Sequence, residues 1–381
     1  MRILLIADND MARREFAMLR RLELDLLGQG VSVALAIPER SWHVAEQEPD
    51  TTLAPPVRYR LRGGPITRPL RCAALNDRVL AAESIGSSPS ADGRELDVVH
   101  VFGSGCWAIA SDLSVRTGAV LFAEVFSPEL AMRAVRVERR RSVLRGRWLA
   151  PSTAMLDRLH TLPVRWPCHA CPWGVHPVDA QRSTDEATAH DTGPTSIAVL
   201  TAAESTGELD ALLAGLADLS RAHEVMLFVS ESVFSNDRRP WRRARELGLI
   251  SVLSLIPDIE QRRDVILACD LAIICEHHGV HRTIALDAMA AGTPLLAQRD
   301  PAVGWFVDHE SCLVLESPRA GDWTRTIAQL IDQPSDARAL GQRAREYARR
   351  HHLRSAHVER LMSLYTAALE STRTIPFRAG A

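Results

Sequence analysis

Residues 270–297 read DLAIICEHHGVHRTIALDAMAAGTPLLA, and their pattern indicates the fold class. Its first six residues form a short, almost unbroken apolar run, which predicts a parallel strand buried on both faces. A polar loop follows, and Thr283 is a good N-cap for a helix that Gly292 ends. The apolar run at 295–297 predicts the next strand. The stretch therefore reads as strand, loop, helix and strand, as in a sheet with crossover helices.

The polar loop from Glu276 to Arg282 follows the carboxyl end of the first of these strands. Open α/β sheets bind ligands at such ends. The free N–H groups at the start of the Thr283 helix favour a phosphate there. Three histidines of the loop add donors: His277, His278 and His281. We expect a nucleotide at this loop, with Arg282 as its main charged contact.

The rest of the chain repeats the same alternation. Apolar strands are predicted near 3–7 and 31–37, with a helix between them, and the pairing should be a right-handed crossover unit. Further strands are predicted at 97–102 and 119–125, and a second series begins near residue 196. Because 381 residues exceed one ordinary core, we predict an α/β fold of two doubly wound, Rossmann-like domains.

Composition limits the partners and the chemistry. The formal net charge is -2, which disfavours general binding to nucleic acid. The sequence contains no lysine, so a lysine Schiff base and the lysine-containing phosphate loop are both excluded. Any basic contact to phosphate must then come from arginine or histidine. The chain has no apolar run of membrane-spanning length and no signal peptide, so we expect a cytoplasmic protein.

The seven cysteines are scattered, and several lie inside apolar runs, which favours a reducing compartment. Cys168 and Cys171 are the exception, because they have the two-residue spacing of half a zinc or redox site. The sequence has no second pair to complete four ligands. A structural metal is therefore not expected.

Arginine is densest in the segment from Pro128 to Trp148, which the apolar spacing predicts to be helical. Within it, only Glu138 offsets the basic run from Arg133 to Arg147. The segment is either a solvated helix face or a surface that makes peripheral contact with an anionic membrane or a polyphosphate acceptor.

Three landmarks resemble one family of enzymes. Residues 286–294, LDAMAAGTP, resemble the Leu-Glu-Ala-Met-Ala-x-Gly-x-Pro signature of retaining glycosyltransferases with the GT-B fold. Val98-Val99-His100 resembles that family's Asp-Val-Val-His strand, and residues 172–176, PWGVH, resemble its inter-domain segment. The landmarks extend over nearly the whole chain.

The resemblance implies a domain plan. Residues 1–178 would form the acceptor-side domain, and a C-terminal helix at 355–375 would pack back on it. Residues 196–354 would form the nucleotide-donor domain, after a polar linker at 179–195. A nucleotide-sugar would be the donor, a saccharide or lipid hydroxyl the acceptor, and no metal or other cofactor would be needed.

The resemblance also assigns donor-binding positions, several of which are substituted here. The family's arginine and lysine for the diphosphate fall on Thr201 and Thr206, which bring no charge. Its two glutamates fall on Gly279 and Asp287, and of these only Asp287 keeps a carboxylate for ribose hydroxyls. A shifted alignment would use Glu276 instead. Together with the loop residues, the expected donor contacts are Thr201, Thr206, His278, Gly279, His281, Arg282, Thr283 and Asp287.

Two more family positions are substituted after the next strand. A glycine pair falls on Pro301-Ala302, where proline offers no N–H to a phosphate. The usual glutamate position falls on Trp305.

For catalysis the resemblance points to the first domain. His100 matches one histidine of the family's His-x-His strand end, and Phe102 replaces the other. The histidine expected near the reacting sugar carbon falls on Val125, which leaves adjacent Glu124 as a candidate. Strand alternation would point Glu124 the other way unless the strand has already ended. A hydrogen-bonded structural histidine is an equally good interpretation of His100.

Two hypotheses follow from these residues. The first is a hexosyltransferase that moves a sugar from a nucleotide donor with retention of configuration. The second is a pseudoenzyme on the same fold that serves as a binding or partner subunit, because function depends on the site and not on the scaffold. An epimerase on this fold is a weaker third alternative.

Overall fold

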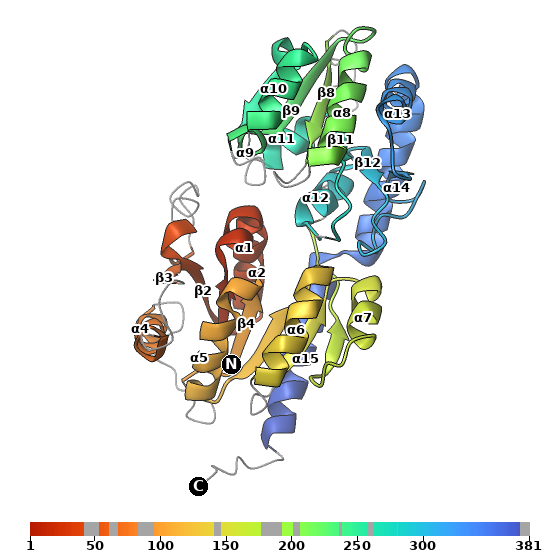
Figure 1. The fold of residues 1–381 in the computed structure, drawn as a ribbon. Coiled ribbons are helices and arrows are strands. Elements are labelled where there is room, and N and C mark those ends of the chain that lie inside the picture. Colours follow the sequence, from red (N-terminus) through yellow and green to blue (C-terminus); the bar gives the residue numbers. More distant parts are fainter. Residues whose placement is uncertain are drawn as a thin grey trace. The chain divides into compact units, whose positions relative to one another are not determined.

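The computed structural model describes residues 1–41, 53–60, 68–82, 95–140, 146–176, 193–200, 206–235, 238–257, 263–279 and 281–373. The chain divides into two compact units (Figure 1). Unit 1 consists of Met1–Pro172 and Ser355–Ala381, and unit 2 of Trp173–Arg354. Most of the linker expected at 179–195 lies outside the described residues.

Unit 1 contains a seven-stranded sheet in the order β3-β2-β1-β4-β5-β6-β7, and every neighbouring pair is parallel. Chain order reverses between β1 and β4, which makes the carboxyl ends of these two strands the switch point of the sheet. The strands are β1 (Arg2–Ala7), β2 (Ser32–Pro38), β3 (Val57–Tyr59), β4 (Val98–Phe102), β5 (Val120–Glu124), β6 (Gly146–Ala150) and β7 (Cys168–Ala170).

Helices flank this sheet, as Figure 1 shows. They are α1 (Asn9–Arg14), α2 (Phe16–Gly28), α4 (Arg68–Leu80), α5 (Trp107–Thr117), α6 (Pro128–Arg140), α7 (Thr153–His160) and α15 (Arg354–Arg373), with short turns η1 (Glu39–Ser41) and η4 (Ser104–Cys106). The last helix, drawn in blue, contacts β4 through Tyr365, whose hydroxyl is hydrogen-bonded to His100.

Unit 2 contains a six-stranded sheet in the order β10-β9-β8-β11-β12-β13, again with every neighbouring pair parallel. The order reverses between β8 and β11. Its strands are β8 (Thr195–Val199), β9 (Val225–Ser230), β10 (Leu253–Ile256), β11 (Leu271–Ile274), β12 (Leu295–Gln298) and β13 (Leu313–Leu315). The predicted pair of doubly wound, Rossmann-like sheets is thereby confirmed.

The helices of unit 2 are α8 (Thr206–Leu219), α9 (Glu231–Ser235), α10 (Arg238–Glu246), α11 (Arg263–Ala268), α12 (Thr283–Ala291), α13 (Ala320–Asp332) and α14 (Pro334–His351), with the turn η5 (Leu249–Ser251). Leucine, isoleucine and valine from strands and helices fill one buried core around Leu212, Ile273 and Trp323. Helix α12 packs on α14 so closely that a side chain at Gly341 would collide with the carbonyl of Gly292.

One predicted element is wrong. The arginine-rich segment predicted to be helical from Pro128 to Trp148 ends as α6 at Arg140, and Arg147 and Trp148 belong to strand β6. The reason is burial: Trp148 is enclosed between Trp107 and Trp166, so the apolar residues at 148–150 form a buried strand rather than a helix face.

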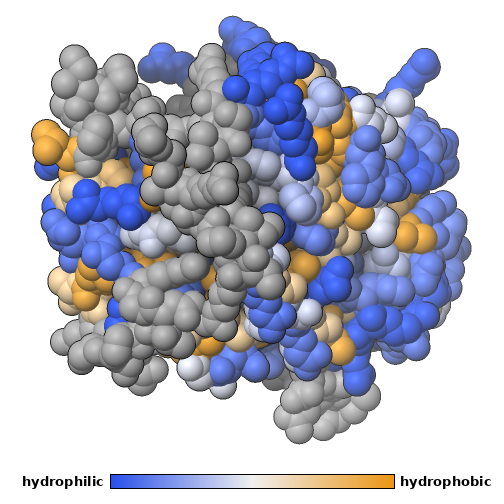
Figure 2. Space-filling model, turned by 90° about the horizontal axis from the view of Figure 1, so that it is seen from below, coloured by the Kyte–Doolittle hydropathy of each residue, from blue (hydrophilic) through white to orange (hydrophobic). Residues whose placement is uncertain are grey.

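In the described part of the chain, no helix is both long and apolar enough to cross a membrane. The exposed large apolar side chains there are Leu24, Leu70, Val115, Met132, Met226 and Ile250. On the face drawn in Figure 2, hydrophobic atoms are scattered among hydrophilic ones. Single exposed apolar residues of this kind are normal for a protein surface.

Candidate functional site

The loop between β11 and α12 lies at the carboxyl end of the unit 2 sheet, as expected. The helix starts one residue earlier than predicted: Arg282 is the N-cap, with an extended backbone (φ -139°, ψ 128°), and Thr283 is the first helical residue. Gly292 ends the helix in the left-handed region at φ 78°, as the sequence predicts. Thr283 is completely buried, so its side chain does not face solvent.

A small, shallow pocket opens beside this loop, and the space of about 290 Å³ counted around it is partly open solvent. Four apolar and four polar side chains line it. The lining residues are Ile274, Glu276, His278, Arg282, Ala285, Asp300, Val303 and Phe306. A concave, partly apolar pocket with a few convergent polar groups at a strand end is the usual form of a small-molecule site.

Arg282 is buried and paired inside this pocket. Its Nη1 donates to Glu276 Oε1 at 2.5 Å and to the carbonyl oxygen of Leu200 at 3.2 Å. Arg282 is 5% exposed and Glu276 9% exposed. Glu276 therefore balances the guanidinium charge that we expected to bind a diphosphate. Arg282 in turn stabilises the loop through these two hydrogen bonds.

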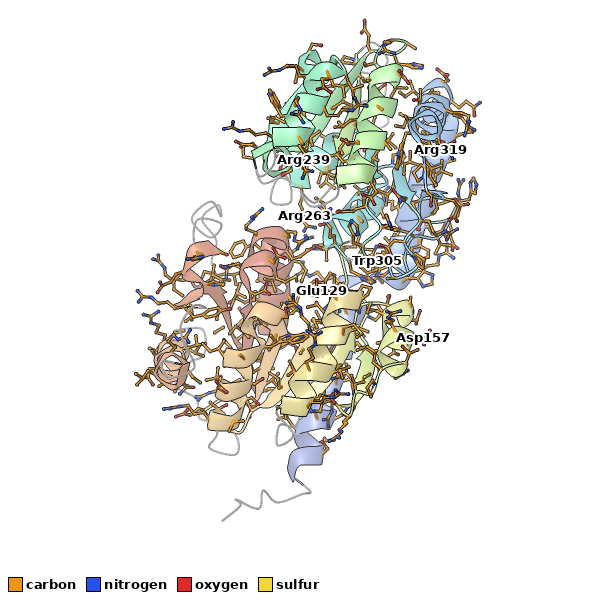
Figure 3. The ribbon with its side chains drawn as sticks, in the orientation of Figure 1. Glu129, Asp157, Arg239, Arg263, Trp305 and Arg319 are labelled. Atoms are coloured by element: carbon orange, nitrogen blue, oxygen red, sulfur yellow. The ribbon has the colours of Figure 1, made fainter. Side chains whose placement is uncertain are left out.

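Asp287 has a basic partner as well. Its Oδ2 accepts a hydrogen bond from Arg263 Nη1, and both side chains are buried. Arg263 begins α11, and in Figure 3 it lies at the same end of unit 2 as Trp305. The carboxylate expected to accept ribose hydroxyls thus takes part in a buried ion pair that joins α11 to α12.

Asp300 is a pocket residue that the sequence did not single out. It follows β12, and its Oδ2 accepts from the backbone N–H of Gly279 at 2.5 Å, while its Oδ1 accepts from Ala302 at 3.0 Å. Gly279 has φ 71°, so the loop adopts a left-handed conformation where it meets this carboxylate. The available signal in the sequence was an acidic residue shortly after a predicted parallel strand.

The three histidines of the loop separate into two kinds. His281 is buried, with its ring edge-on to Trp305 at 4.6 Å, so its predicted role as a phosphate donor does not fit its place in the packing. His277 and His278 are exposed, and their rings stack at 5.2 Å. The Nδ1 of His277 lies 3.1 Å from Glu208 Oε1 and 3.0 Å from Gln298 Nε2.

Trp305 occupies a structural position in unit 2. Its ring also packs edge-on against His352 at 5.3 Å, and His352 Nδ1 donates to the carbonyl oxygen of Trp173 at 2.9 Å. Burial lowers the pKa of His352 to about 4, so this imidazole is neutral. Of the remaining expected contacts, Thr201 lies outside the described residues, and Thr206 begins α8 with a side chain that is not described.

In unit 1, the two expected catalytic residues are sealed in the interior. His100 Nε2 lies 3.3 Å from Glu124 Oε1, and both residues are 0% exposed. Strand alternation places them together, because His100 pairs with Phe122 in the sheet and Glu124 is two residues further along β5. By the same alternation, adjacent Val125 points to the other face of the sheet.

Helix α15 closes this face of the sheet. The hydroxyl of Tyr365 is 2.6 Å from His100 Nδ1, and burial raises the pKa of that hydroxyl well above its usual value, so it donates to the imidazole. Burial also lowers the pKa of His100 to about 3. His100 is therefore a neutral, hydrogen-bonded interior residue, and neither it nor Glu124 can touch a substrate while α15 is in place.

Three arginines of α6 are exposed, whereas Glu138, their expected counter-ion, is buried. Arg133, Arg136 and Arg139 are exposed at three-residue spacing, which places them on one face of the helix. Glu138 does not offset them, because it is buried and accepts from Trp148 Nε1 at 2.6 Å. Glu129, labelled in Figure 3, pairs with Arg133 instead. The side chain of Arg140, and all of 141–145, lie outside the described residues.

Cys168 and Cys171 differ in their surroundings. Cys171 is buried with its Sγ 3.6 Å from His357 Nδ1, and burial raises the pKa of the Cys168 thiol to about 11. Over the described ranges, no three histidine, cysteine or acidic side chains gather as metal ligands.

The fold is that of known sugar-transferring enzymes. Sucrose-phosphate synthase from Thermosynechococcus elongatus aligns over 97% of this chain and 100% of its own, with a TM-score of 0.71 and 16% identity. Anabaena Alr3699/HepE in complex with UDP-glucose aligns over 96% and 100%, with a TM-score of 0.70 and 13% identity. The chain has the GT-B fold of glycosyltransferases.

Sequence relatives point in the same direction over a shorter region. D-inositol 3-phosphate glycosyltransferase from Thermobispora bispora is 33% identical over 140 residues, which are 36% of this chain and 32% of that protein. D-inositol 3-phosphate glycosyltransferase 2 from Catenulispora acidiphila is 29% identical over 140 residues, 36% of this chain and 33% of that protein. The chain thus spans about a third of the length of these curated relatives, and no family model matches it.

Proposed function

We propose that this GT-B protein is a glycosyltransferase that moves a sugar from a nucleotide-sugar donor to a hydroxyl group of an acceptor. The observation that carries the proposal is the pocket at the carboxyl end of β11, which lies at the switch point of the unit 2 sheet. Structural neighbours include a protein that holds UDP-glucose, and the sequence relatives are named as glycosyltransferases. Both likenesses support this class of reaction.

For the acceptor, we propose a saccharide, a lipid or a related polyol. The relatives are named for D-inositol 3-phosphate, which makes this compound the first acceptor to test. We also propose transfer with retention of configuration and without a metal ion, as the signature at 286–294 implies.

The test is a turnover panel. The protein is incubated with UDP-, GDP- and ADP-sugars, with and without D-inositol 3-phosphate or simple saccharides. Released nucleoside diphosphate and the glycosylated product are quantified by mass spectrometry, and NMR assigns the anomeric configuration. Acceptor-dependent product supports the proposal, unchanged rates with EDTA support metal independence, and no product from any pair contradicts the enzymatic function.

The paired charges of the pocket favour a second candidate. Arg282 and Asp287 both have buried ionic partners, so two of the expected donor contacts are engaged inside the protein. A pseudoenzyme that binds a ligand or a protein partner without turnover would show this arrangement. Saturable nucleotide-sugar binding by calorimetry, with no product in the panel above, would select this function.

The exposed arginines of α6 support a further proposal of peripheral contact with an anionic membrane. Arg133, Arg136 and Arg139 share one face, and Met132 beside them is 48% exposed. Basic side chains next to an exposed apolar one are typical of surfaces that dock on anionic lipid. Such a contact would bring the protein to a lipid acceptor.

A further inference from the structure

Among the residues that the structure describes, some charged side chains of the unit 2 pocket pair with an opposite charge, and another does not. Glu276 and Arg282 neutralise each other at 2.5 Å. Asp300 is also buried, at 6% exposure, yet within the described residues no basic side chain pairs with it. The pocket therefore presents an unbalanced carboxylate rather than a free cation.

The carboxylate of Asp300 is held rigidly but is not saturated. Two backbone N–H groups donate to it, from Gly279 to Oδ2 and from Ala302 to Oδ1. An ionised carboxylate offers about four lone-pair sites, so acceptor capacity remains on both oxygens. The rest of the lining includes Val303 and Phe306, which provide apolar surface.

A ligand that matches this arrangement is neutral and carries hydroxyl donors next to an apolar face. A diphosphate does not match it, because a carboxylate repels an anion and the buried arginine is already paired. The ring of a hexose does match it, since neighbouring hydroxyls can donate to the carboxylate while the C–H face packs on apolar side chains. Hydrogen bonds to a charged acceptor are about twice as strong as neutral ones.

We infer that Asp300 recognises the hydroxyl groups of the transferred sugar and determines which sugar the donor carries. This rests on the proposed function and adds to it a specificity-determining residue on the loop after β12. The hydrogen bond from the Gly279 N–H holds the carboxylate in place.

The test compares nucleotide with sugar-nucleotide affinity. Calorimetry measures UDP, UDP-glucose, UDP-galactose, GDP and GDP-mannose on the wild type, on Asp300→Asn and on a matched control, Asp308→Asn. Asparagine keeps the size of the side chain, and its one carbonyl oxygen can accept from one of the two backbone N–H groups that Asp300 binds. Asp308 also accepts a backbone N–H, from Val314 at 2.9 Å, but it does not line the pocket.

We expect the preferred sugar nucleotide to bind the wild type more tightly than its parent nucleotide. In Asp300→Asn this sugar-dependent gain, and the discrimination between glucose and galactose, should shrink about tenfold, while affinity for the nucleotide alone stays unchanged. Asp308→Asn should behave as wild type. Thermal unfolding of all three proteins checks that the variants are folded.

The outcomes separate the inference from the proposed function. Equal losses for UDP and UDP-glucose in Asp300→Asn would mean that Asp300 only supports the loop, and a sugar-dependent gain that survives the substitution would overturn the inference. In both cases the proposed function stands. A wild type that binds no member of the panel removes the proposed function and the inference with it.

Discussion

The two units have the same kind of sheet but place their charges differently. In unit 1, His100, Glu124 and Tyr365 form a polar cluster that α15 seals from solvent, and the arginines of α6 remain exposed. In unit 2, Arg282 and Arg263 are buried in ion pairs beside an open pocket. A polar residue at a strand end therefore indicates a functional site only if no helix or charged partner buries it.

The largest effect is expected from breaking the buried pair in unit 2. Arg282→Ala removes the guanidinium that pairs with buried Glu276, which should lower the free energy of unfolding by about 3 to 5 kcal/mol. Urea unfolding measures it. The matched control is Arg299→Ala, because Arg299 pairs with Glu316 on the surface and should cost less than about 1 kcal/mol. Equal stability of wild type and Arg282→Ala would mean that the pair does not support the loop.

The pH dependence of stability tests the buried histidines of both units. The pKa of His100 is about 3 and that of His352 about 4 in the folded protein, below the ordinary value of 6.5. The unfolded chain therefore binds more protons below pH 6.5, and stability is full above that pH and falls as the pH drops. Each histidine should cost about 2 kcal/mol between pH 7.5 and 5.0.

His100→Gln and His352→Gln separate these two contributions. Each variant should flatten the pH dependence of urea unfolding by its own share. A profile that neither buried-site variant changes would show that the two imidazoles do not stay neutral in the folded state.

A smaller loss is expected when the α15 contact in unit 1 is removed. Tyr365→Phe deletes the hydroxyl that donates to His100 and leaves a buried acceptor, at a cost of about 1.5 kcal/mol in stability. Tyr347→Phe in unit 2, where the ring is half-buried, is the control. Nucleotide binding should be the same in both variants, and a loss confined to Tyr365→Phe would return the His100 cluster to the candidate site.

The smallest effect concerns the exposed arginines. Arg136→Ala and Arg139→Ala should each weaken binding to vesicles containing anionic lipid by about 1 kcal/mol at low salt and leave stability unchanged. Arg325→Ala, on an exposed arginine of α13 in unit 2, is the control. If wild-type protein is not retained by anionic vesicles at low salt, the membrane proposal is wrong.

The layers, the strand that leads to the site and the glycine that ends α12 could all be predicted from the sequence. These features depend on apolar periodicity and on the backbone freedom of glycine, which act over a few residues. The sequence also placed the pocket loop correctly, because a loop between a parallel strand and a helix must lie at the carboxyl edge of the sheet.

The partners of the charged groups, in contrast, depend on the folded chain. Arg263 and Asp287 are 24 residues apart in the chain, Gly279 and Asp300 are 21 apart, and His100 and Tyr365 are 265 apart. No local pattern encodes such pairings, since they depend on how helices and loops pack after the sheet has formed. Burial then sets whether a polar group is a structural support or a contact for a ligand, and burial is a property of the folded chain.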